Sequence, residues 1–386
     1  MHDVNFDEII DRRNTGTRKW DRMDELFGRN DLMPFWIADM DFKTSNDIIS
    51  ALKDECERGV FGYPDKLDEC REALIPWMKA RHNWDIPKGA ISFFPRIMGG
   101  IAIAIESFTR PGDKIVIQSP VYPPFANMVD YAGRELKENP LINNDGKYEI
   151  DFGGLEKLFQ DGAHVLMFCS PHNPVGRVWS KEELCRLAGL CQKYNILIFC
   201  DEIHHDLIYS GHQHTCLGSM DGIRESLITF VAPTKTFNLP GLMASAAIIE
   251  NKAMAEAYDK SLKRFDIQVN QMGQTAFIAA YQKAKNWLEQ LLPYLEGNRD
   301  FVYEEIKKCK SISAFRPEGT YLYWLDFSPS GLNAEEIQKK LTDVAGVALH
   351  DGRMFGKCGE KFMRLNIACP REYLRKGINK IIGAFE

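Results

Sequence analysis

The middle of the chain alternates short apolar runs with amphipathic segments. Runs of strand length occupy residues 114–120, 164–171, 196–202, 227–233 and 245–250, with the sequences KIVIQSP, HVLMFCSP, ILIFCDE, LITFVAP and SAAIIE. Runs rich in Ile, Val and Phe without polar alternation are typical of strands buried on both faces. Between two of them, KEELCRLAGLCQKYN repeats Leu and Cys at helical spacing. This pattern predicts an α/β domain with a mostly parallel sheet.

The pattern changes after about residue 285. Long charged helices are predicted in NWLEQLLPYLEGNRDFVYEEIKKCK and NAEEIQKKLTDVAG, with the strand-like run YLYWLDF at residues 321–327 between them. This change indicates a smaller α+β domain. We therefore predict a large α/β domain over residues 45–285, with residues 1–44 and 286–386 forming an N-terminal segment and a small C-terminal domain.

Composition narrows the classes of partner. The 386 residues are 45% hydrophobic and 26% charged, and the net charge of −6 gives no reason to expect binding to nucleic acid or to an anionic membrane. The first residues are too acidic for a signal peptide, and no apolar run approaches the ~18 residues of a membrane span. We therefore expect a soluble, cytoplasmic protein that acts on a small molecule. Its 10 cysteines form no C-x-x-C pair and are interpreted as reduced and mostly buried.

Polar side chains follow three of the predicted strands where each strand ends. Asn173 lies in CSPHNPVG, Asp201 directly follows ILIFC, and Lys235 follows LITFVAP in a predicted loop. Ligand sites in open α/β sheets gather at such strand ends. A lysine at the edge of an apolar sheet loses hydration, which lowers its pKa and makes the amine more nucleophilic. The three residues are spaced by one strand and one crossover each, so they could converge.

Each of these residues also has an ordinary structural interpretation. Lys235 could be a solvated loop lysine, and Asn173, which is flanked by prolines, could be a turn former. Asp201 would need a compensating donor, because an unpaired buried charge costs several kcal/mol.

The ordered motifs N-P-x-G, D-E-I-H, T-K-T-F-N-x-x-G and R-x-N-x-A resemble those of the class I/II aminotransferases of fold type I. Enzymes of this family use pyridoxal 5′-phosphate (PLP). The resemblance implies that Lys235 binds PLP covalently and later moves the substrate proton, while Asp201 pairs with the ring nitrogen N1. It also implies that Asn173 donates to the ring O3′, that His204 lies near O3′, and that Tyr122 in SPVYPPF covers the ring face.

The same resemblance places the phosphate of PLP at FFPRIMGGIAIAIESF, residues 93–108. The backbone amides of Ile97 and Met98 would bind it, Thr234 would add a hydroxyl, and Tyr63 would reach it from the partner subunit of a homodimer.

Two features depart from this family pattern. Arg96 and the pair of glycines after Met98 differ from the usual small residues, and Met243 stands where many relatives carry an arginine eight residues after the lysine. The sequence assigns no replacement for that arginine.

Substrate contacts are also implied by the resemblance. Arg364 in KFMRLNIACPRE resembles the arginine that holds the substrate α-carboxylate as a bidentate pair, and Asn366 would share its face of the strand. An arginine on an exposed edge strand is the structural alternative. Asp39, Met40 and Tyr321 are predicted to line the substrate side, and packing roles for them are equally open.

A cluster of histidines and a carboxylate near residue 205 invites a metal interpretation. Its members are His204, His205, Asp206, His212 and His214. Their spacing matches no compact zinc pattern, and no cysteine pair supports one. We therefore predict no metal.

His204 and two N-terminal segments, DRRNTGTRKWD and PFWIADMDFKT, narrow the resemblance to the cystathionine β-lyase-like C–S lyases of the MalY/PatB type. The resemblance runs from end to end and includes PEGTYLYWLDF. Such enzymes cleave a carbon–sulfur bond by α,β-elimination and yield pyruvate, ammonia and a thiol, which is homocysteine when the substrate is L-cystathionine.

Two alternatives stay open at this point. An aminotransferase would share the first steps, and the branch depends on fine geometry that motifs do not report. A regulatory protein that binds a transcription activator is the second, because that role is known in the group beside lyase activity.

Overall fold

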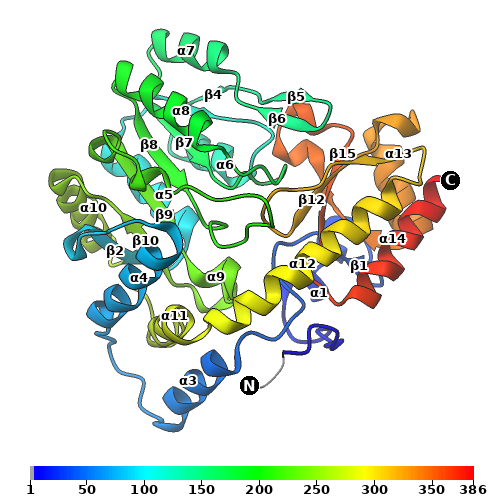
Figure 1. Cartoon of the computed structure of the whole chain (residues 1–386), viewed down its shortest axis with the longest axis horizontal. Helices are drawn as coiled ribbons and strands as arrows, with labels where there is room; N and C mark the ends of the chain where they lie inside the picture. Colours follow the sequence, from blue (N-terminus) through cyan, green and yellow to red (C-terminus); the bar gives the residue numbers. More distant parts are fainter. Residues whose placement is uncertain (1–3) are drawn as a thin grey trace.

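A seven-stranded sheet forms the centre of the computed structural model, which describes residues 4–386 (Figure 1). The strand order is β2–β10–β9–β8–β7–β3–β4, and β10 is antiparallel to both of its neighbours while the other pairs are parallel. The strands are β2 (Ile91–Phe94), β3 (Lys114–Ile117), β4 (Glu135–Glu138), β7 (Val165–Cys169), β8 (Leu197–Asp201), β9 (Leu227–Val231) and β10 (Ser245–Ile248). The predicted, mostly parallel sheet is confirmed.

The apolar runs bury both faces of this sheet. In β7, Val165 and Met167 pack into the core on one face, whereas Leu166 and Phe168 pack into the core on the other. Successive side chains of a strand point to opposite faces, so an unbroken apolar run is stable only when both faces are covered.

Helices cover each face. One core includes residues of α5 (Ile97–Phe108), α6 (Pro124–Tyr131) and α10 (Lys252–Arg264), and the other includes residues of α7 (Phe152–Gln160) and α8 (Lys181–Lys193). Helix α8 begins with a capping box, in which the Ser180 side chain accepts from the backbone of Glu183 and the Glu183 side chain accepts from that of Ser180. The sequence therefore marks the start of this helix by itself.

Three further helices pack against one another beside the large sheet. Helix α11 (Gln271–Lys283) packs against α3 (Asn46–Glu57) and α4 (Leu67–His82). Shorter turns are α1 (Arg18–Asp21), α2 (Asp24–Phe27), α9 (Pro233–Thr236), η1 (Lys88–Ala90), η2 (Leu217–Ser219), η3 (Arg224–Ser226), η4 (Pro240–Leu242), η5 (Ser328–Ser330), η7 (Gly352–Phe355) and η8 (Lys357–Gly359).

A second, antiparallel sheet has the order β11–β12–β15–β14. Its strands are β11 (Ser313–Ala314), β12 (Leu322–Asp326), β14 (His350–Asp351) and β15 (Phe362–Asn366), and the helices of this region are α12 (Lys285–Ile306), α13 (Ala334–Lys339), the π-helix η6 (Lys340–Ala345) and α14 (Arg371–Phe385). In Figure 1, α12 and α14 lie beside each other at the side of the molecule away from α10.

Two small pairings complete the strands. β1 (Met33–Pro34) pairs in parallel with β13 (Val347–Ala348), and β5 (Ile142–Asn144) pairs with β6 (Lys147–Glu149). The first pairing ties the N-terminal segment to the C-terminal region. The domain division at residue 285 stays a prediction, and α12 begins at that residue.

The predicted loop at Lys235 was wrong. The residue lies in the short helix α9, which begins with Pro233 after β9 has ended at Val231. Proline is favoured in the first turn of a helix because its fixed φ suits the turn and its missing N–H has no partner there.

Two expectations from composition can also be compared with the structure. All 10 cysteines are free, and every one except Cys56, Cys185 and Cys358 is buried. Within residues 4–386, no helix combines the length and the apolar character that crossing a membrane requires.

Candidate active site

Strand order brings the three polar strand ends together. β7, β8 and β9 are parallel neighbours, and the last residue of β8, Asp201, pairs with Cys169 of β7 and Phe230 of β9. Asn173 follows β7 and Lys235 follows β9. The carboxyl ends of these strands therefore form one edge, where Lys235 and Asp201 are close enough for each to influence the charge of the other.

Lys235 projects toward the N-terminal segment. Its Nζ donates to the backbone carbonyl of Ala38, and the Tyr321 hydroxyl donates to the same oxygen at 3.0 Å. Desolvation lowers the pKa of Lys235 to about 8, with the nearby carboxylate of Asp39 opposing the effect and the charge of Arg364 adding to it. The neutral amine is therefore a minor but accessible form near physiological pH.

Asp201 is a buried carboxyl group with few donors. One of its oxygens, Oδ1, accepts from the backbone N–H of Ile203 at 3.0 Å. Desolvation raises the pKa of Asp201 to about 7, although this hydrogen bond and the Lys235 charge lower it. A buried carboxyl group of this kind can hold a proton shared with a ring nitrogen.

Arg364 is a buried cation without a carboxylate partner among residues 4–386. Its Nη1 donates to Asn173 Oδ1 at 3.0 Å, and its Nη2 contacts the Trp36 carbonyl at 3.0 Å and His350 Nδ1 at 2.9 Å. Its Nε has no hydrogen-bond partner within the same residues. Desolvation lowers the pKa of Arg364 to about 10. A buried, uncompensated guanidinium with a free donor is suited to bind a carboxylate.

His204 and Tyr122 flank this edge of the sheet. The His204 ring makes an edge contact with Tyr321 at 5.7 Å between centroids, and its Nδ1 has no partner in the described chain. Desolvation, followed by the charges of Lys235 and Arg364, lowers the pKa of His204 well below its usual range, so the ring is neutral. Desolvation likewise raises the pKa of the half-buried Tyr122.

The N-terminus of α5 provides donors for an anion. Ile97 and Met98 are its first two residues, and the preceding Arg96 makes no side-chain cap, which leaves the amides of the first turn free of that partner. Arg96 Nε lies 2.9 Å from Met243 Sδ. The Arg96 guanidinium therefore lies beside Met243, the residue that stands where many relatives carry an arginine. Thr234 is buried in α9.

Two residues that were predicted to contact the substrate or the phosphate, Asp39 and Tyr63, have different neighbours in the structure of the single chain. The Asp39 carboxylate pairs with Arg12 at 2.8 Å and with Lys19 at 3.3 Å, so its charge is already matched. A substrate contact of Asp39 stays a prediction. Tyr63 is fully exposed and does not contribute to the site of its own chain.

Sequence reasoning did not predict that two asparagines hold the segment WIADMDF, residues 36–42, against the site. Asn238 Nδ2 donates to the Met40 carbonyl at 3.0 Å, and Asn238 Oδ1 accepts from the Met40 N–H at 3.0 Å. Asn366 Nδ2 donates to the Ile37 carbonyl at 2.7 Å. The signal was available, because Asn238 and Asn366 belong to the motifs that contain the lysine and the arginine.

Two polar clusters, buried except for the half-buried His82, lie beside this edge. One contains His82, His205 and Asp206, and the other contains Glu202, His214 and Cys216. Asp206 accepts from Trp77 Nε1 at 3.1 Å and from Thr236 Oγ1 at 3.0 Å, and Thr236 follows Lys235 directly. These hydrogen bonds explain the buried carboxylate of Asp206 as a group that holds α9 in place. The interpretation without a metal stays a prediction.

Comparison with known families agrees with this arrangement. The family model described as aminotransferase class I and II matches residues 30–381. The chain belongs to the class I and II aminotransferase family. Its α/β architecture is that of the PLP-dependent enzymes of fold type I.

Individual members of the family are similar over their whole length. Cystathionine beta-lyase PatB of Bacillus subtilis (strain 168) is 40% identical over 388 residues, which cover 99% of this chain and 100% of that protein. A PLP-bound protein of Clostridium difficile 630 with an aminotransferase designation superposes with a TM-score of 0.98 at 38% identity and full coverage of both chains. The PLP-bound C–S lyase of Staphylococcus hominis gives 0.92 at 31% identity, with 99% and 98% coverage.

Proposed function

We propose that the protein is a PLP-dependent β-lyase of cysteine thioethers. The reaction consumes the thioether and water and releases a thiol, pyruvate and ammonia. The observation that carries the proposal is the buried Arg364, whose charge has no carboxylate partner in the described chain and which lies close enough to Lys235 to lower its pKa. A cation in this position is matched by the α-carboxylate of an amino acid.

The residues of the site fit PLP. Lys235 would hold its aldehyde carbon covalently, Asp201 would pair with the ring nitrogen, and Asn173 would donate to the ring oxygen. The amides of Ile97 and Met98, together with the Thr234 hydroxyl, would bind the phosphate, and the Arg96 guanidinium would supply a positive charge there. PLP bound in this way supplies an electron sink for the charge that develops when a bond to the substrate Cα breaks.

The side chains of the site bind the substrate and move its protons. Arg364 fixes the α-carboxylate, and Asn173 in turn orients Arg364. Lys235 removes the Cα proton, because its lowered pKa leaves a neutral amine available. Asp201 would keep a proton at the ring nitrogen, and Tyr122 would cover the ring. The carbon–sulfur bond then breaks, and the sulfur leaves with the electron pair and takes up a proton.

Elimination is favoured over transamination by the relatives. A protein 40% identical is named a cystathionine beta-lyase, and the Staphylococcus hominis structure is named a C–S lyase. The aminotransferase designation of the Clostridium difficile protein keeps transamination as the second candidate.

Incubation with L-cystathionine, without any 2-oxo acid, separates the two reactions. A lyase releases pyruvate and free thiol in equal amounts, measured by lactate dehydrogenase coupling and by a thiol reagent. An aminotransferase releases neither and turns over only when a 2-oxo acid acceptor is added. Absence of pyruvate in the first assay would refute the lyase proposal.

We infer a homodimer from an exposed apolar segment near residue 61. Val60, Phe61 and Tyr63 are all exposed, and a second copy of the chain would cover them. Tyr63 would then reach the phosphate site of the partner subunit. Sedimentation equilibrium of the holoenzyme tests this inference, and a monomer at micromolar concentration would contradict it.

A further inference from the structure

The N-terminal motif DRRNTGTRKWD, residues 11–21, supplies two cations to a buried ion cluster. Lys19 Nζ lies 2.7 Å from Asp41 Oδ2 and 3.3 Å from Asp39 Oδ1. The Arg12 guanidinium lies 2.8 Å from Asp39 Oδ2 and 2.7 Å from Asp41 Oδ1. Two cations and two carboxylates therefore form one cluster in which the formal charges cancel.

The four side chains of this ion cluster are largely buried. Burial favours their neutral forms, but Asp41 and Asp39 raise the pKa of Lys19, and Lys19 and Arg12 lower the pKa of Asp39, so both groups stay charged. Replacing buried ion pairs by well-packed apolar residues is often neutral or stabilising. Stability alone therefore does not explain why the chain keeps four charges here.

The two cations also hold backbone carbonyl groups of the segment that contacts the Lys235 amine. Lys19 Nζ donates to the Asp39 carbonyl at 3.2 Å, and Arg12 Nη1 donates to the next carbonyl along the chain at 3.1 Å. The carbonyl just before these two, that of Ala38, accepts from Nζ of Lys235. The cluster therefore fixes the peptide groups that follow the acceptor of this amine.

Charged groups from several elements also face Lys235. Desolvation has the largest effect on its pKa and lowers it, and the charged groups follow in the order Asp39, Arg364, Asp201 and Lys19. The carboxylates raise the pKa and the cations lower it. Two neutral groups, His204 and Tyr321, are further neighbours. Asp39 and Lys19, which pair with each other, therefore act on the charge of Lys235 in opposite directions.

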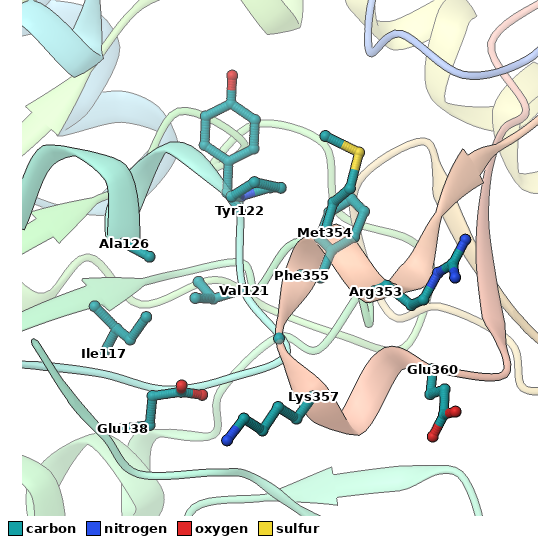
Figure 2. A pocket seen from close by; sticks show the side chains of 12 residues that line it. Ile117, Val121, Tyr122, Ala126, Glu138, Arg353, Met354, Phe355, Lys357 and Glu360 are labelled. Carbon is teal, nitrogen blue, oxygen red and sulfur yellow. The ribbon is translucent and has the colours of Figure 1, made fainter. Parts of the chain in front are cut away.

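The ion cluster lies apart from the cavity beside Tyr122. This cavity of about 580 Å³ is lined by residues between 117 and 126, by Glu138, and by residues between 353 and 360. Figure 2 shows Tyr122 and Phe355 among the side chains that line it. All four members of the cluster lie at other positions of the chain, so they can act on a reaction without lining this space.

We propose that Arg12 and Lys19 are positioning residues of the active site, which hold the Ala38 carbonyl against Lys235 and balance the carboxylate charge beside it. This inference rests on the proposed role of Lys235 as the base that removes the Cα proton. Without Lys19, the charge of Asp39 would keep the proton on Lys235 and leave less neutral amine. The motif at residues 11–21 thus acts on the proton transfer from outside the site.

Opposite charge changes in the apoprotein test the proposal. Competitive acetylation with acetic anhydride over a range of pH, followed by peptide mass spectrometry, gives the pH at which half of Lys235 is reactive, here called the labelling midpoint. Lys19→Met should raise this midpoint by about 0.5–1.5 pH units, and Asp39→Asn should lower it by a similar amount. The double variant loses one charge of each sign and should return close to the wild-type value.

A purely structural role predicts a different result. Loosening of the segment would hydrate Lys235, which would raise the labelling midpoint in both single variants. Asp39→Asn keeps an oxygen acceptor for Arg12 and leaves Asp41 paired with both cations, so it decides the test even if Lys19→Met does not fold. Equal midpoints in all proteins, or a shift of both single variants in one direction, would overturn the inference.

The exposed pair of Glu8 and Lys43 provides the matched control. Lys43→Met and Glu8→Gln make the same charge changes in an ion pair that water screens, so the labelling midpoint should not change. In the holoenzyme, the acid limb of kcat for pyruvate release from L-cystathionine should shift with the midpoint of each cluster variant. Shifted midpoints without any pyruvate would support the effect of the cluster on Lys235 and overturn the lyase proposal.

Discussion

Replacement of Arg364 by Met should separate the activity of the protein from its stability. Arg364 is 2% exposed and has no carboxylate partner in the described chain, and the lowering of its pKa to about 10 corresponds to roughly 3 kcal/mol of unfavourable burial at neutral pH. Methionine removes this burial cost together with the hydrogen bonds to Asn173, the Trp36 carbonyl and His350. The two changes oppose each other in the free energy of unfolding.

The loss of activity should be much larger. Removing one partner of a buried charge pair costs about 3–5 kcal/mol, which predicts a fall in kcat/KM of about 10²–10⁴-fold if Arg364 binds the α-carboxylate. Arg364→Lys keeps the charge without the bidentate geometry, so it should recover part of this loss. Pyruvate release from L-cystathionine measures both variants.

Arg134 provides the matched control. It is also a buried arginine, but Glu106 pairs with it at 3.0 Å and Thr109 Oγ1 accepts from it at 2.8 Å. Urea unfolding of the apoprotein should show that Arg134→Met is more destabilising than Arg364→Met by roughly 3 kcal/mol, because only the Arg134 charge is already matched by a carboxylate. Equal destabilisation of the two variants, or a loss of kcat/KM below tenfold for Arg364→Met, would refute the reasoning.

Three further predictions concern individual residues. The raised pKa of Asp201 means that its contribution to apoprotein stability is present below about pH 4 and is lost as the pH rises through about 7. Asp201→Asn should therefore stabilise the apoprotein above about pH 7 by a few kcal/mol relative to the wild type. Parallel urea-unfolding profiles of the two proteins from about pH 5 to 8 would contradict this. Arg96→Ala should weaken PLP binding to the apoprotein about three- to tenfold in a fluorescence titration, with Arg96→Lys closer to the wild type, and an unchanged Kd would exclude Arg96 from the phosphate site. Asn238→Ala removes three hydrogen bonds to the segment 36–42. It should lower kcat about tenfold and the free energy of unfolding by about 2–3 kcal/mol. An unchanged kcat would show that this segment does not position Lys235.

The sequence predicts five of the seven strands of the large sheet, because these strands lie in apolar runs that are stable only when both faces are covered, whereas β4, with the sequence ELKE, carries no such signal. It also brings Asn173, Asp201 and Lys235 to one edge, since parallel neighbours share their carboxyl ends. The short helix at Lys235 was missed because four residues are too few to show a helical period.

Contacts between distant parts of the chain lie beyond such reasoning. The hydrogen bonds of Arg364 to Asn173 and the Trp36 carbonyl depend on how the two sheets and the N-terminal segment pack together. The contact of Arg96 with Met243 depends on the antiparallel pairing of β2 with β10, which are far apart in the sequence. No local pattern reports that packing. The ion pairs of Asp39 with Arg12 and Lys19 were missed for the same reason.

The hydrogen bonds from Arg364 and Asn366 to the backbone carbonyls of residues 36 and 37 also have a consequence for the order in which the chain is synthesised and folds. These contacts join positions separated by 328 and 329 residues, so they cannot form until synthesis has passed Asn366. A nascent chain that already contains the complete seven-stranded sheet, with Lys235 in place, still lacks β15, the strand that carries the proposed carboxylate-binding arginine. The proposed site can therefore be completed only after the large sheet has been synthesised.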